Sequence, residues 1–104
     1  MNNQDSPQIL ALKERYKSSL EDKVQMLSDY LIAIDSDEAT LAELSELRGF
    51  LHKLAGSSGM YGYDDISAAS REAMLVADQV DSMANIDDLK AMTSEVVKLL
   101  QSHC

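Results

Sequence analysis

The chain has 104 residues, enough for one domain with a modest core, and carries 18 acidic against 9 basic side chains, for a formal net charge of −9. This balance argues against nucleic acid and anionic membranes as partners, because their phosphates would repel the protein. One cysteine, no apolar run of bilayer length and a polar start indicate a cytoplasmic protein that forms a single domain over residues 1–104.

The first predicted element begins at Pro7, because Ser6 is a favourable N-cap and proline fits the first helical position. Residues 1–6 are expected to form a flexible N-terminus. Apolar residues then recur every three or four positions, which indicates one apolar helical face. They are Ile9, Leu12, Tyr16, Leu20, Val24, Leu27, Leu31 and Ile34. Because Ser18 and Glu21 have capping-box spacing, either one helix over 7–34 or a short helix followed by a second is compatible with the pattern.

The second long element is predicted over residues 38–60. It follows a polar break with capping potential at residues 35–37. One side of this helix is apolar and should be buried. It consists of Leu44, Leu47, Leu51 and Leu54, with Ser58 at its end. Gly62 is expected just beyond the helix, where a left-handed residue can close the last turn.

Two further helices complete the pattern. The third starts near Asp64 and Asp65, which favour its positive end, and the fourth is capped by Asn85 after a connection at residues 81–84. Their predicted buried stripes are Ile66, Ala69, Ala73, Val76 and Val80, and Ile86, Leu89, Thr93, Val96 and Leu100. Short connections imply antiparallel neighbours, so the fold is predicted as an all-α, up-down four-helix bundle, with or without a short extra N-terminal helix.

The face opposite the apolar side of the 38–60 helix has an unusual composition. It carries His52, with Arg48 one turn before it and Gly56 one turn after it. Interior glycines cost a helix roughly 0.5 to 1 kcal/mol each relative to alanine, so bare backbone must serve another purpose here. A titratable nucleophile with cations nearby and open space suits an incoming phosphoryl group. Arg48 and Lys53 are the candidate cations, and the helical angle favours Arg48.

The run HKLAGSSGMYG closely resembles the signature of histidine-containing phosphotransfer (HPt) domains. The matching positions are His52, Leu54, Gly56, Ser57, Ser58 and Gly62. Many members carry a lysine three residues after the histidine, where this chain has Ala55. This departure makes Arg48 or Lys53 the candidate substitute cation.

The resemblance implies a phosphoryl carrier in a multistep two-component phosphorelay, with His52 as the phosphorylated residue. It would take the group from a receiver-domain aspartate, such as that of a hybrid sensor kinase, and pass it to another response-regulator receiver. Arg48, Lys53 and Gly56 would support the transfer. The expected partner-docking positions are Ser45, Gly49, Ala55 and Gly59. The protein is expected to act as a monomer.

No kinase activity, cofactor or metal is expected for this chain, and the receiver would supply magnesium. The sequence has no glycine-rich nucleotide loop between a strand and a helix, and neither His52 nor His103 follows a glutamate at the spacing of a di-iron bundle. Methionines 26, 74, 83 and 92 are interpreted as gap fillers, and His103 as disordered. Two alternatives are an adaptor that binds a receiver through the His52 face without phosphorylation, and an acidic structural bundle whose interface is the first helix.

Overall fold

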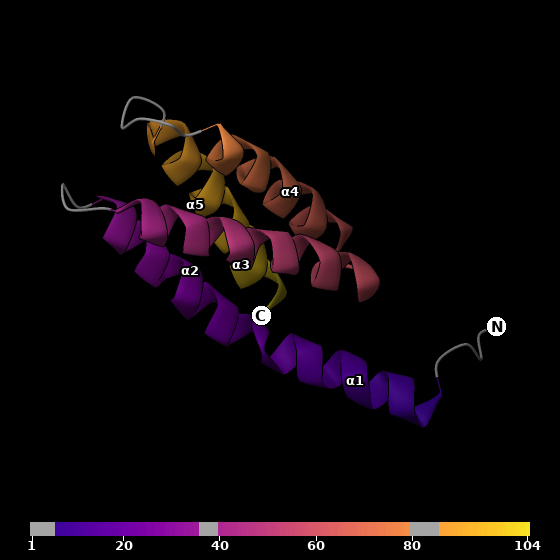
Figure 1. The fold of residues 1–104 in the computed structure, drawn as a ribbon. Coiled ribbons are helices and arrows are strands. Elements are labelled where there is room, and N and C mark those ends of the chain that lie inside the picture. Colours follow the sequence, from indigo (N-terminus) through magenta and orange to yellow (C-terminus); the bar gives the residue numbers. More distant parts are fainter. Residues whose placement is uncertain (1–5, 36–39, 80–85) are drawn as a thin grey trace.

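The computed structural model describes residues 6–35, 40–79 and 86–104, and these residues form five helices. They are α1 (Pro7–Ser18), α2 (Leu20–Asp35), α3 (Leu41–Met60), α4 (Asp64–Asp78) and α5 (Ile86–His103). Helices α2 to α5 pack side by side as an elongated bundle, and α1 leaves the bundle at one end (Figure 1). The described part of the chain contains no strand, so the prediction of an all-α bundle is confirmed, and of the two N-terminal alternatives the structure has the short extra helix.

The first apolar stretch is divided into two helices at Ser19. The Ser19 hydroxyl donates to the Tyr16 carbonyl oxygen at 2.6 Å, and its backbone N–H bonds to the Arg15 and Tyr16 carbonyls at 3.1 and 3.0 Å. Ser18 is the last residue of α1 and does not cap α2, so the predicted capping box at Ser18 is wrong. The Ser6 cap is confirmed, because its hydroxyl accepts from the Ile9 N–H at 3.3 Å. The rest of the expected flexible N-terminus lies outside the described residues.

The apolar stripe of α1 is only partly buried, contrary to the sequence pattern. Tyr16 is buried, but the side chains of Ile9 and Leu12 are 39% and 44% exposed. The reason is visible in Figure 1, where α1 diverges from the bundle towards its N-terminal end. Tyr16 holds its other end in place. The Tyr16 ring stacks on Tyr61 with 4.4 Å between centroids, and its hydroxyl lies 2.8 Å from the Ser57 hydroxyl.

The core lies between the apolar stripes of α2, α3, α4 and α5. All five stripe residues predicted for α5 are buried, and so are Leu47, Leu51, Leu54 and Ser58 of α3. From α2 the core takes Leu20, Leu27 and Ile34. None of the described helices is long and apolar enough to cross a membrane.

Helix α3 begins later than predicted. Thr40 is its N-cap and forms a capping box with Glu43, whose backbone N–H donates to the Thr40 hydroxyl at 3.2 Å. The polar run at residues 35–37 suggested an earlier start, but Asp35 is the last residue of α2 and residues 36–39 lie outside the described part. At the other end Gly62 has φ of +88°, and the Tyr63 N–H donates to the Ser58 carbonyl at 2.8 Å, so the predicted left-handed closure is confirmed.

Helix α4 packs closely against α3 through small residues. Its buried residues are Ile66, Ser67, Ser70 and Ala73, so two serines adjoin the predicted stripe, whose last residue, Val80, lies outside the described part. The Ser67 hydroxyl donates to the Ala55 carbonyl of α3 at 2.7 Å. A β-carbon built on Gly59 would lie 3.1 Å from the Ser67 Oγ. We call this contact of Ala55 and Gly59 with Ser67 the α3–α4 seam.

His103 is ordered at the end of α5, and the expectation that it is disordered is wrong. Its Nε2 lies 2.9 Å from a carboxylate oxygen of Asp65, and its ring meets the Tyr63 ring edge-on at 5.0 Å. The hydrogen bond with His103 lowers the pKa of the Asp65 carboxyl. The second histidine of the chain therefore connects α5 to the start of α4, far along the bundle from the turn that carries Arg48.

Candidate functional site

His52 lies on the outward side of α3, as the helical angle predicts. Its side chain is exposed, whereas the adjacent Leu51 is fully buried. Its Nδ1 lies 3.3 Å from the Sδ atom of Met74 on α4. Within the described residues, Nε2 has no hydrogen-bond partner, so one ring nitrogen is held and the other is open to solvent.

Gly56 leaves open space beside the imidazole. A β-carbon added at Gly56 would meet no atom within 4 Å outside its own stretch of helix, and the same holds for Gly49. Close helix packing therefore does not explain either glycine. Their missing side chains expose the backbone of α3 on the side that carries His52.

Two of the predicted docking positions turn towards α4 instead. Ala55 is only 6% exposed, so its side chain cannot be offered to a partner, and its assignment to the docking face is corrected. Gly59 is exposed, but the Ser67 hydroxyl occupies the space where its side chain would begin, so packing in the α3–α4 seam accounts for this glycine. Both positions face α4, because Ser67 of that helix contacts Ala55 and adjoins Gly59.

The two candidate cations differ in their surroundings. The Arg48 guanidinium donates to the carboxylate of Asp78, the last residue of α4, and this hydrogen bond raises the pKa of Arg48. Lys53 is exposed and has no ion-pair partner among the described residues. Ser45 is exposed beside Arg48, in a shallow hollow that also includes Asp78. Although the helical angle favours Arg48, Lys53 is the cation whose charge is not already neutralised.

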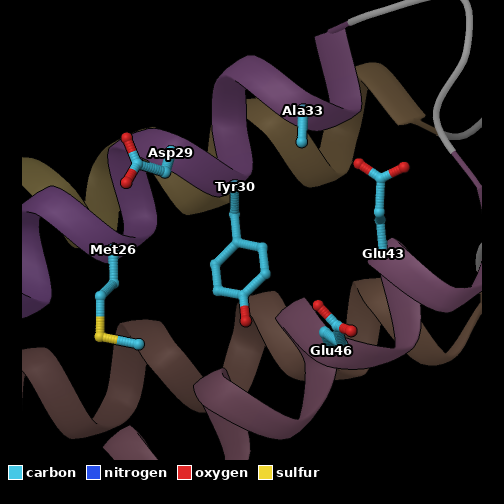
Figure 2. A pocket seen from close by; sticks show the side chains of 6 residues that line it. All are labelled: Met26, Asp29, Tyr30, Ala33, Glu43 and Glu46. Atoms are coloured by element: carbon cyan, nitrogen blue, oxygen red, sulfur yellow. The ribbon is translucent and has the colours of Figure 1, made fainter.

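A groove runs along the other side of α3, between it and α2. Figure 2 shows side chains from both helices facing this space, with the ring of Tyr30 reaching from α2 towards α3. We call it the α2–α3 groove. Its lining comprises Met26, Asp29, Tyr30, Ala33, Glu43 and Glu46. The hollow continues past Gly49 and Phe50 to Lys53, so Lys53 lies between the groove and the His52 face.

The imidazole of His52 is a nucleophile that can form and break a bond to a transferred group. In the described part of the chain, no carboxylate contacts His52, and no cluster of three or more histidine, cysteine or acidic side chains could hold a metal ion. Catalysis of hydrolysis usually needs a positioned base for water, a metal or a second nucleophile. An exposed imidazole nitrogen can instead accept a group and release it again.

Sequence reasoning missed both α4 residues that contact this face. Met74 was one of several methionines interpreted as gap fillers, and Asp78 was one of many surface carboxylates. Their signal is their spacing along α4: Met74 and Asp78 are one helical turn apart, as are His52 and Arg48 on α3. That spacing becomes informative only when the register of α4 against α3 is known.

The comparison with protein families agrees with this geometry. The family described as Hpt domain matches residues 11–100, which include His52 and nearly the whole bundle. No curated protein and no solved structure matches the chain. Hpt domains are phosphotransfer carriers of two-component signalling that interact with response-regulator receivers, and they are not kinases. Because the match covers most of its length, the chain belongs to the Hpt domain family.

Proposed function

We propose that His52 is the residue through which this Hpt protein carries the phosphoryl group. It would accept the group from the aspartate of one receiver domain, such as that of a hybrid sensor kinase, and pass it to the aspartate of another. The observation that carries this proposal is the open Nε2 of an exposed imidazole on a packed bundle, with Gly56 leaving free space beside it.

The transfer is a displacement at phosphorus. The Nε2 lone pair forms the new P–N bond while the P–O bond to the receiver aspartate breaks and leaves a carboxylate. Imidazole suits this exchange because its ordinary pKa of about 6.5 leaves a neutral ring at physiological pH, and the phosphorylated ring is a good leaving group. The reverse reaction with a second receiver regenerates neutral His52.

Charge near the reacting atoms would come mainly from Lys53 on this chain and from magnesium held by the receiver. Phosphoryl transfer spreads negative charge over the phosphoryl oxygens, and a cation nearby stabilises it. Arg48 is less available because Asp78 accepts its hydrogen bond. An acidic protein can handle phosphate in this way because the group arrives on a docked partner and not from solution.

Docking would use the outward side of α3 and the adjoining surface of α4. Met60 at the end of α3 is 79% exposed and Leu75 of α4 is 50% exposed, so apolar surface is available for a partner. Ser45 and Gly49 would lie within the covered area. We further propose that the protein acts as a monomer in the cytoplasm, where its receiver partners would be found.

The adaptor function is the second candidate, and one observation favours it. Ala55 replaces the usual lysine and is buried, while the nearby Arg48 is neutralised by Asp78, so this face has fewer free cations than a phosphoryl acceptor would use. An adaptor would bind a receiver through the same surface and take no phosphate.

A labelling experiment separates the two functions. Phosphorylated receiver domains with magnesium are mixed with the wild type, with His52→Gln and with His103→Gln, which removes the other histidine. We expect the wild type and His103→Gln to become labelled and His52→Gln to remain unlabelled. Equal labelling of His52→Gln would refute the role of His52, and receiver binding without any labelling of the wild type would establish the adaptor.

A further inference from the structure

The contact between His52 and Met74 joins the reacting ring to the neighbouring helix. The sulfur of Met74 lies 3.3 Å from Nδ1, within hydrogen-bonding distance for a sulfur acceptor. Met74 is half-buried and packs against the core, and Ala73 beside it is fully buried. The packing of α4 against the core therefore restricts the position of the thioether.

We propose that Met74 is a positioning residue that keeps the proton of neutral His52 on Nδ1 and so leaves the Nε2 lone pair free for phosphorus. Its relevance to phosphoryl transfer rests on the function proposed above. The protonation of the ring nitrogens is a property of the unphosphorylated protein, and it can be measured without any transfer.

The direction of the hydrogen bond follows from the chemistry of the two groups. A thioether sulfur has lone pairs but no hydrogen, so it can only accept. A neutral imidazole carries its proton on one nitrogen, and the hydrogen bond made by that nitrogen decides which one it is. With the proton on Nδ1 the contact is a weak N–H···S bond, whereas with the proton on Nε2 two lone pairs would face each other.

A neutral acceptor has an advantage over a charged one at this position. A carboxylate beside Nδ1 would favour the imidazolium ion, which has no lone pair on either nitrogen. The sulfur orients the ring without adding charge, and in the described residues no carboxylate contacts the ring. The ring is therefore oriented and remains nucleophilic.

The α3–α4 seam fixes the distance between the two residues. Ser67 donates to the Ala55 carbonyl across the seam at 2.7 Å, and Gly59 leaves room for that hydroxyl. On the other side of the contact, one turn from His52 and Met74, Arg48 and Asp78 connect the same helices. His52 and Met74 lie between these two links, so the separation of α3 and α4 is set on both sides of the contact.

The test measures the imidazole nitrogen shifts of His52 by long-range ¹H–¹⁵N NMR at about pH 8, where a free imidazole is neutral. Met74→Leu keeps the apolar packing but removes the acceptor. Met74→Gln provides an amide oxygen as a different acceptor. Met26→Leu is the matched control, because Met26 lies on α2 and is 45% exposed. His103→Gln assigns the His52 signals.

We expect the ratio of Nδ1–H to Nε2–H forms to fall about two- to tenfold in Met74→Leu, the range for one net hydrogen bond. Met74→Gln should restore the ratio, and Met26→Leu should leave it unchanged. The rate of transfer to Met74→Leu should fall by no more than the same factor, with unchanged affinity for the receiver. An unchanged ratio in Met74→Leu, or a ratio that Met74→Gln does not restore, would overturn the proposal, whatever the labelling experiment shows for His52.

Discussion

The two sides of α3 differ in how closely the neighbouring helix approaches. On one side the α3–α4 seam is closed by small residues and a 2.7 Å hydrogen bond between Ser67 and the Ala55 carbonyl. On the other side the α2–α3 groove is lined by long side chains and stays open (Figure 2). His52 contacts the closed side through Met74. The His52 ring thus lies beside the closed seam, and the open groove lies on the other side of α3.

The largest expected difference comes from truncating one residue under the site and one in the groove. Leu51, next to His52 in the sequence, is fully buried, so Leu51→Ala should lower the free energy of unfolding by about 2 to 5 kcal/mol. Met26 is 45% exposed in the α2–α3 groove, so Met26→Ala should cost under about 1 kcal/mol. Urea titration monitored by circular dichroism measures both. Equal losses would show that the groove is packed as tightly as the core.

Replacing Gly59 or Gly56 with leucine compares the closed α3–α4 seam with the open face of α3. Gly59→Leu forces a side chain onto Ser67 and should lower the free energy of unfolding by about 1 to 3 kcal/mol. A β-carbon added at Gly56 meets open space, so Gly56→Leu should raise the free energy of unfolding by roughly 0.5 to 1 kcal/mol.

The rate of phosphoryl transfer tests whether the open space beside His52 is used. Gly56→Leu should slow phosphoryl transfer about tenfold or more, equivalent to about 1.4 kcal/mol, because the new side chain obstructs a docked receiver. A stable Gly56→Leu protein with wild-type transfer would show that the open space beside His52 is not used.

The contact between α1 and α3 provides a further test. The Tyr16 hydroxyl of α1 lies 2.8 Å from the Ser57 hydroxyl of α3. Tyr16→Phe should lower the free energy of unfolding by about 1 kcal/mol through loss of that hydrogen bond. Burial raises the pKa of Tyr16 above 10.0, and the hydrogen bond with Ser57 partly opposes this shift. The folded state therefore favours the neutral phenol, so the stabilisation is complete below pH 10 and falls as pH rises through the folded-state pKa.

Urea midpoints of the wild type and Tyr16→Phe between about pH 9 and pH 11 measure this alkaline effect. The wild type should lose more stability than the variant over that interval. Parallel pH profiles would contradict the assignment of the effect to Tyr16.

The smallest expected effects concern the two cations. Lys53→Gln should slow transfer about three- to tenfold, because its charge is available to the phosphoryl oxygens. Arg48→Gln should change the rate less than about threefold, because Asp78 already accepts its hydrogen bond. Initial rates at low and high salt measure both effects, and the Lys53 effect should shrink with salt. A larger loss for Arg48→Gln would reassign the helper cation.

Much of the fold follows from apolar periodicity, and its exceptions have physical causes. Periodicity cannot show where a bundle ends, so Ile9 and Leu12 belong to the predicted apolar face although α1 leaves the bundle and both are exposed. The stripe predicted for α4 also left out Ser67 and Ser70, which are buried beside it. The small Ser67 side chain lies directly against Ala55 and Gly59 of α3.

In the candidate site, the residues contributed by α3 could be predicted from the sequence, whereas those contributed by α4 could not. The exposure of His52 and the bare backbone at Gly56 follow from angles around α3. Met74 and Asp78 come from α4, and their contacts depend on how the two helices are aligned. The burial of Ala55 depends on the same alignment, which a single sequence does not specify.

The most direct test of the account is to identify the phosphorylated atom by ³¹P NMR and mass spectrometry of the wild type after reaction with a phosphorylated receiver. The account predicts phosphorus on Nε2 of His52, because Met74 holds Nδ1 and Nε2 is open. Phosphorus on Nδ1, on another residue, or on no residue of a protein that binds the receiver would contradict it.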